Sequence, residues 1–132
     1  MIIDQILDRL YICDSDFTEE GLDQNKITHI LNVGGVDIQE TFGRRYYHEH
    51  LLDGKGNAST SFPTILFYME KVLTSTYSQR LLVCCRAGMS RSAFIILLWL
   101  RRMGMSTDEA YKFIKSKRPI VQINLELMEE MV

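Results

Sequence analysis

Residues 81–103 read LLVCCRAGMSRSAFIILLWLRRM, and this stretch decides how the rest of the chain is interpreted. Its first three residues are apolar and predict a buried strand, and the run that begins at Arg91 predicts a core helix, apolar on nearly every side. Between strand and helix lies a short polar loop that starts at Cys85 and contains Gly88. This order turns the backbone N–H groups of the loop and of the helix start toward one point, where a tetrahedral oxyanion would bind.

The residue types of this loop suit chemistry on a phosphoryl group. A cysteine that faces a helix N-terminus beside an arginine is favoured as its thiolate, which is the nucleophilic form. Five residues separate Cys85 from Arg91, enough for one turn of backbone around an anion. Gly88 suits the φ-positive part of that turn, and the planar Arg91 fork matches two phosphate oxygens, which a lysine cannot do. Ser92 is placed to donate a hydrogen bond to the sulfur when it leaves. The backbone N–H groups expected to hold the anion belong to Arg86, Ala87, Gly88, Met89 and Ser90.

The segment LLVCCRAGMSRS resembles the phosphate-binding loop of the cysteine-dependent protein tyrosine phosphatases, in particular their dual-specificity branch. The resemblance implies Cys85 as nucleophile and Arg91 as phosphate clamp, with no metal or other cofactor. The segment ITHILNV at 27–33 also resembles this family, which implies that Asn32 braces the loop from behind. The alternative is an asparagine that merely ends a strand by bonding its own backbone. One position departs from the family pattern, because Cys84 stands where a histidine normally precedes the nucleophile.

Asp53 is the expected general acid. It follows a strand predicted over 45–52 and opens a polar loop, 54–61. The oxygen that leaves phosphorus needs a proton, and the same carboxylate can later take one from the attacking water. The family's aspartate also follows a strand upstream of the cysteine, and Asp53 lies 32 residues before Cys85. The alternative is an aspartate that only shapes a turn with Gly54.

Apolar periodicity and capping residues predict the other elements. Strands are expected at 10–13, 27–33, 45–52 and 80–84, and helices at 19–26, 61–75, 91–103, 107–117 and 124–131. Asp16 with Glu19 resembles a helix start, Pro63 is expected at a first helical position, and Ser106 with Glu109 predicts a capping box. Asn124 is expected to cap the last helix.

Strands that alternate with helices predict an α/β fold in one domain, residues 1–132, like that of the dual-specificity phosphatases. Its mostly parallel central sheet should be flanked by helices on both faces. Ligands of such sheets bind at the carboxyl ends of the strands. Cys85, Asn32 and Asp53 each follow a predicted strand, so we expect them to meet at one edge.

Composition narrows the class of protein further. A chain of 132 residues with 46% hydrophobic content suffices for one core, and a net charge of −2 gives no basic footprint for nucleic acid or an anionic membrane. Three cysteines without a secretory signal predict a reducing, cytoplasmic compartment. His48 and His50 lack a third ligand of matching spacing, so no metal site is predicted. The arginine pairs 44–45 and 101–102 are interpreted as solvated charge.

The resemblance therefore implies a metal-independent phosphatase that acts on phosphotyrosine and on phosphoserine or phosphothreonine in proteins through a phosphocysteine intermediate. We expect a monomer whose partners are phosphorylated proteins, with no nucleic-acid or membrane partner. Two alternatives stay open. Cys84 in place of histidine could mark a phosphate-recognising binding module with weak or no turnover. Relatives also act on RNA 5′ ends or phosphoinositides, although this loop lacks the lysines typical of lipid-directed members.

Overall fold

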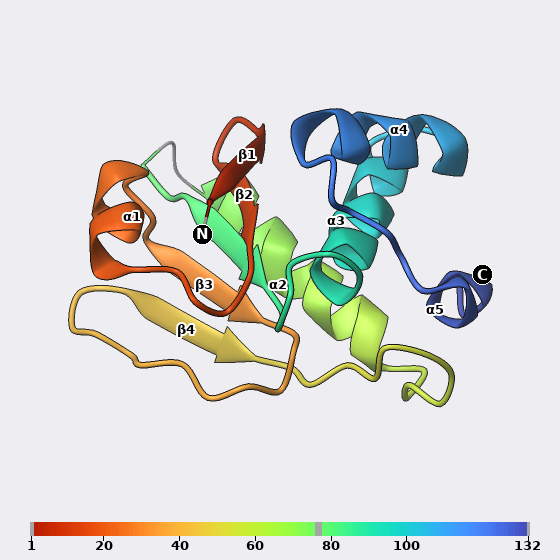
Figure 1. Ribbon diagram of the computed structural model, residues 1–132, viewed down its shortest axis with the longest axis horizontal. Coiled ribbons are helices and arrows are strands. Elements are labelled where there is room, and N and C mark those ends of the chain that lie inside the picture. Colours follow the sequence, from red (N-terminus) through yellow and green to blue (C-terminus); the bar gives the residue numbers. More distant parts are fainter. Residues whose placement is uncertain (1, 76–77, 132) are drawn as a thin grey trace.

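The structure is a computed structural model that describes residues 2–75 and 78–131. Its centre is a five-stranded sheet of β1 (Asp4–Leu7), β2 (Leu10–Cys13), β3 (His29–Asn32), β4 (Arg45–His48) and β5 (Leu81–Cys84). The strands lie in the order β1-β2-β5-β3-β4, and all neighbours are parallel except β1, which pairs antiparallel with β2 at one edge (Figure 1). The central strand β5 therefore delivers Cys85 to the middle of the carboxyl edge.

Helices cover both faces of this sheet. They are α1 (Glu19–Gln24), α2 (Ser61–Ser75), α3 (Arg91–Arg102), α4 (Thr107–Lys117) and α5 (Leu125–Glu129). One apolar cluster joins Val83 of β5 to Phe94 of α3 and to α2, and a smaller one joins Leu82 of β5 to Leu22 of α1. Because side chains alternate along a strand, the two clusters lie on opposite faces. The predicted α/β fold with a mostly parallel sheet and helices on both faces is confirmed.

Helix α3 is the core helix that its sequence predicts. Phe94, Ile96 and Leu97 are fully buried. Each such side chain contributes about 1.5–3 kcal/mol when it leaves water. The helix ends at the exposed Arg101 and Arg102, where positive charge complements the carbonyl end of the helix dipole. Its apolar body thus fixes its polar first turn against the carboxyl edge of the sheet.

Two predicted helix starts are confirmed. The Ser106 hydroxyl accepts from the Glu109 N–H at 3.1 Å, and the Glu109 carboxylate accepts from the Ser106 N–H at 3.0 Å. These bonds hold the pKa of the Glu109 carboxyl below its ordinary value. Asn124 caps α5, because its side chain accepts from the Glu126 N–H at 2.8 Å.

Other boundaries differ from the sequence prediction. Thr18, not Asp16, caps α1, with its hydroxyl accepting from the Gly21 N–H at 3.0 Å. The helix also stops at Gln24, because Lys26 has φ +55°, which no α-helix continues through. Pro63 is the third residue of α2, still inside the first turn, where no N–H partner is needed. Strand β4 ends at 48 rather than 52, β3 spans 29–32 rather than 27–33, and β1 was not predicted.

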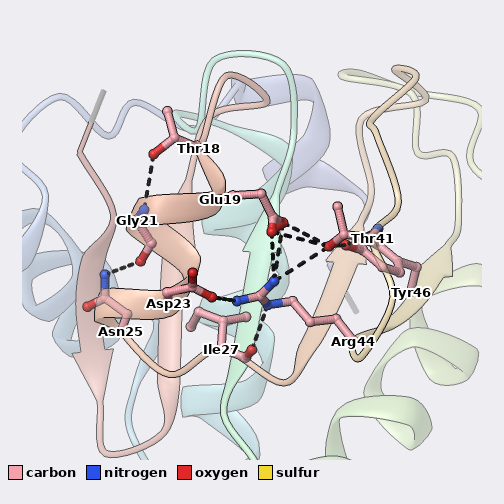
Figure 2. A network of polar contacts seen from close by, with 9 residues as sticks. All are labelled: Thr18, Glu19, Gly21, Asp23, Asn25, Ile27, Thr41, Arg44 and Tyr46. Atoms are coloured by element: carbon pink, nitrogen blue, oxygen red, sulfur yellow. Dashed lines mark hydrogen bonds and ion pairs between the residues drawn. The ribbon is translucent and has the colours of Figure 1, made fainter.

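The expectation of solvated charge is wrong for Arg44, whose side chain is only 11% exposed. Figure 2 shows its guanidinium between Glu19 and Asp23 of α1, and its Nε donates to the Ile27 carbonyl at 2.9 Å. Thr41 also donates to Glu19, at 2.8 Å. This network joins α1 to the segment that leads into β4. Its bonds to α1 and to Ile27 lie beside the small apolar cluster, which contains Leu22 and Ile27.

Candidate active site

Cys85 follows β5 and is 2% exposed. Its Sγ lies 3.2 Å from the Oγ of Ser92, which is fully buried in the first turn of α3. The pair therefore combines a sulfur at the base of a loop with a hydroxyl that can bond it. This is the contact that a departing sulfur would need.

Three of the loop carbonyls bond to groups outside the loop. Arg86 O accepts from Ser15 N at 3.2 Å, Gly88 O from Arg118 Nε at 2.8 Å and Met89 O from Gln122 N at 3.0 Å. Each trans peptide points its N–H opposite to its C=O, so these bonds aim the N–H groups of the next residues into the loop. Among the described residues, the N–H groups of 86–90 find no protein acceptor. An arrangement of this kind, at the start of α3, can accept an anion.

Two glycines allow neighbouring backbones to approach this loop. Gly88 has φ +64°, as its sequence position predicts, and a Cβ there would lie 2.7 Å from the carbonyl carbon of Cys13. A Cβ on Gly34, just beyond β3, would lie 2.7 Å from the Cα of Cys85. Both distances are shorter than real Cβ contacts. The ends of β2 and β3 therefore clamp the loop from two sides.

Arg91 reaches from the start of α3 to this same edge. Its Nη1 donates to the Gly34 carbonyl at 3.1 Å and to the Leu51 carbonyl at 3.2 Å. Because Gly34 packs on the backbone of Cys85, the guanidinium bonds a direct neighbour of the cysteine. Within the described part of the chain, its Nε and Nη2 have no protein acceptor. Part of the fork is therefore available to an anion.

Asp53 lies at the exposed rim of the loop. Its carboxylate accepts from the Ser90 hydroxyl at 2.6 Å, and its carbonyl accepts from the Asn124 amide at 2.8 Å. The Ser90 hydroxyl in turn accepts from the Asn124 N–H at 2.9 Å. The sequence suggested Ser90 mainly as a backbone donor and Asn124 as a helix cap. Ser90 and Asn124 together hold Asp53 close to the start of α3.

Asn32 lies behind this edge and is 1% exposed. Its Oδ1 accepts from the Gly34 N–H at 3.1 Å, and its Nδ2 donates to the Val36 carbonyl at 2.7 Å. It therefore shapes the turn whose Gly34 packs on Cys85 and bonds Arg91. The predicted bracing of the phosphate loop by Asn32 stays a prediction, and the contacts that would transmit it run through Gly34.

Cys84 points away from the loop. It belongs to the small apolar cluster on the α1 face, together with Cys13, its register partner on β2. Burial, reinforced by the charge of a Cys85 thiolate, raises the pKa of Cys84 above its ordinary value, and burial beside Asp14 raises the pKa of Cys13 to about 12. Both remain protonated thiols at neutral pH. Nothing in the described residues links the Cys84 sulfur to the loop by a hydrogen bond.

Arg118 is the contributor that sequence analysis missed. The sequence prediction placed it just after the helix over 107–117, but the residue is 4% exposed and its side chain bonds the Gly88 carbonyl. The two residues lie 30 positions apart, so no local pattern connects them. An arginine followed by proline at the end of an amphipathic helix was the only available signal.

His48 lies near this edge and bonds other side chains. His48 bonds Glu40 at 2.9 Å and lies 3.2 Å from the Asn32 amide nitrogen. Across residues 2–75 and 78–131, no three His, Cys, Asp or Glu side chains are grouped to hold a metal ion. Over the same ranges, no helix has the length and apolar character needed to cross a membrane.

A mostly parallel sheet whose central strand leads to a buried cysteine, in a loop that ends at an arginine, defines the class of cysteine-dependent phosphatase folds. Comparison with known families places the chain within that class. Residues 10–132 match the family "Dual specificity phosphatase, catalytic domain", and the chain belongs to it.

Individual relatives agree with this membership. Human dual specificity protein phosphatase 16 is 32% identical over 136 residues, which is 97% of this chain but 20% of that protein. The structure of a mouse putative dual specificity phosphatase complexed with zinc tungstate has a TM-score of 0.86 and 25% identity, and the match covers 97% of this chain and 82% of that one. Human tyrosine phosphatase-like serine/threonine/tyrosine-interacting protein shares the fold, with a TM-score of 0.83 and 21% identity over 97% and 91% of the two chains. This chain thus spans one-fifth of the first relative's length.

Proposed function

We propose that this domain is a protein phosphatase that hydrolyses phosphotyrosine and phosphoserine or phosphothreonine through a phosphocysteine intermediate. The observation that carries the proposal is the buried Cys85 sulfur, 3.2 Å from the Ser92 hydroxyl, at the base of a loop in which the carbonyls of Arg86, Gly88 and Met89 bond to groups outside it. A tetrahedral oxyanion fits the N–H groups that this arrangement turns inward.

In the first step the Cys85 thiolate attacks phosphorus, an S–P bond forms and the bond from phosphorus to the leaving oxygen breaks. Asp53, as the carboxylic acid, gives its proton to that oxygen. The Arg91 fork and the loop N–H groups stabilise the charge on the three other oxygens. The Ser90 hydroxyl, 2.6 Å from Asp53, keeps the acid at the rim where the leaving group departs.

In the second step a water molecule attacks the phosphocysteine and Asp53 takes its proton. The S–P electron pair returns to sulfur, so inorganic phosphate forms and Cys85 leaves as the thiolate. The Ser92 hydroxyl can donate to that sulfur across the 3.2 Å contact. Each group returns to its starting protonation state, and the chemistry needs no metal or cofactor.

The substrate class follows from the rim and from the relatives. Asp53 and Ser90 meet at a solvent-exposed position, which lets a residue carried on a protein reach the loop. Relatives named as dual specificity protein phosphatases 16, 2 and 1 match 97%, 97% and 84% of this chain. The net charge of −2 supports proteins over polyanionic nucleic acid or lipid. We also propose a monomer in the cytoplasm; the three free cysteines support that compartment.

Steady-state hydrolysis of an aryl phosphate by wild type and by Cys85→Ser tests the reaction. We expect turnover that the variant loses. Equal rates for the two proteins would favour a phosphate-binding module instead.

A panel of matched phosphotyrosine and phosphothreonine peptides, a phosphoinositide and a 5′-triphosphorylated RNA tests the substrate class. We expect both peptides to have the highest kcat/KM. Preference for the lipid or the RNA would contradict the assignment to proteins.

A further inference from the structure

Arg118 is a buried arginine that bonds directly to the loop between Cys85 and Arg91. Its Nε donates to the Gly88 carbonyl at 2.8 Å, while its Nη1 donates to the Asp4 carboxylate at 2.8 Å and to the Ile2 carbonyl at 2.9 Å. One guanidinium therefore bridges the loop and the N-terminal strand β1. The side chain of Arg118 is 5% exposed and that of Asp4 is 26% exposed.

The position of Arg118 is set by α4 and not by the loop. Its N–H donates to the Ile114 carbonyl at 2.9 Å, and its own carbonyl accepts from the Val121 N–H at 3.1 Å. The side chain thus starts from a fixed backbone. A displaced Gly88 would separate from Arg118 and would not carry it along.

The bond to Gly88 also orients a second group. The Gly88 carbonyl and the Met89 N–H belong to one planar trans peptide and point in opposite directions. Holding the carbonyl on Arg118 therefore aims the Met89 N–H into the loop. The contact is tight, since a Cβ on Gly88 would lie 2.8 Å from the Nη2 of Arg118.

Asp4 supplies the charge that lets the guanidinium stay buried. A buried cation without its partner is strongly unfavourable, and a long flexible side chain can instead turn toward water. Loss of Asp4 would therefore release Arg118, and Arg118 would release the Gly88–Met89 peptide. The Arg118 side chain thus couples β1 to the loop.

We propose that Arg118 is a positioning residue that aims the Met89 N–H at the bound phosphoryl group, and that Asp4 of β1 holds Arg118 in place. Docking of the N-terminal strand then supports oxyanion binding by a loop far along the chain. The inference rests on the proposed function only for the identity of the anion.

The test is tungstate binding measured by calorimetry for Arg118→Met, Asp4→Ala and the double variant. We expect Arg118→Met to weaken binding by about 10- to 100-fold, the equivalent of one charge-assisted hydrogen bond. Asp4→Ala should weaken it by about twofold to fivefold, as a partly exposed partner. The double variant should bind like Arg118→Met alone, because Asp4 acts only through Arg118.

Arg102→Met and Asp8→Ala are the matched controls, because both residues are exposed, and their affinity should equal that of wild type. Circular dichroism establishes that each variant is folded at the temperature of the titration. If Arg118→Met does not fold, Arg118→Lys replaces it, since lysine keeps the charge but cannot bond Asp4 and Gly88 as a fork. An affinity equal to that of the controls, or independent effects in the double variant, would overturn the inference.

The outcome is separable from that of the proposed function. Wild type that binds tungstate without hydrolysing aryl phosphate would refute the phosphatase and leave the coupling measurable. Turnover with no effect of Arg118→Met on tungstate affinity would refute the coupling alone. Wild type that binds no oxyanion would refute both.

Discussion

Gly34→Ala is the substitution for which the structure gives the sharpest expectation. The new Cβ would lie 2.7 Å from the Cα of Cys85 and 2.8 Å from the backbone nitrogen of Arg86. These are backbone atoms, which cannot rotate aside as a side chain could. To reach an ordinary contact of 3.4 Å, the turn after β3 and the phosphate loop must separate by 0.7 Å.

Separation of this size displaces groups that contact both Cys85 and Arg91. Gly34 packs on the cysteine backbone, and its carbonyl also accepts from Arg91. Overpacking by one methyl group costs about 1–3 kcal/mol. If the loop yields, we expect kcat/KM for an aryl phosphate to fall by about 5- to 150-fold, because each 1.4 kcal/mol is a factor of ten.

Gly54→Ala is the matched control. Its Cβ would meet only the Glu126 carboxylate, at an ordinary 3.8 Å. The assay is kcat/KM with an aryl phosphate, together with the melting temperature of each variant. If Gly34→Ala equals Gly54→Ala in both measurements, the close approach of Gly34 to the backbone of Cys85 does not support the site.

Three further expectations concern other parts of the molecule. Because burial raises the pKa of Cys13 to about 12 and raises that of Cys84 as well, both stay protonated at neutral pH. Iodoacetamide should therefore label Cys85 alone in the folded protein, and equal labelling of Cys84 by mass spectrometry would contradict this. Asp53→Asn should lower kcat for an ester with a poor leaving group by about 10²- to 10⁴-fold while phosphate inhibition is retained, and an unchanged kcat would assign the acid elsewhere. Arg44→Met should lower the free energy of unfolding in urea by about 1–3 kcal/mol with unchanged kcat/KM, since its bonds to Ile27 and α1 lie away from the loop; an unchanged unfolding midpoint would show that this network adds no stability.

The parts of the fold that sequence predicted are those set by neighbouring residues. The capping box of Ser106 and Glu109 spans three positions, and it fixed the start of α4 correctly. The apolar run at 10–13 gave β2 with its observed bounds. The loop from Cys85 to Arg91 was likewise recognisable because its strand, glycine and helix are consecutive.

The parts that sequence missed depend on contacts between distant segments. Asp4 meets Arg118 across 114 positions, and Ser90 meets Asp53 across 37. The strand that carries Asp4 was missed because only its pairing with β2 makes it a strand. Arg44 was interpreted as solvated because its partners on α1 lie more than 20 positions away. A single sequence does not show which charges the fold will bring together.

Trapping the covalent intermediate tests the central claim most directly. Wild type and Ser92→Ala are mixed with an aryl phosphate, quenched in acid, digested and examined by mass spectrometry. We expect one phosphate group on Cys85, in larger amount in Ser92→Ala because the second step is slowed, and none in Cys85→Ser. Continued turnover with no phosphate on Cys85 in either protein would contradict a phosphocysteine mechanism.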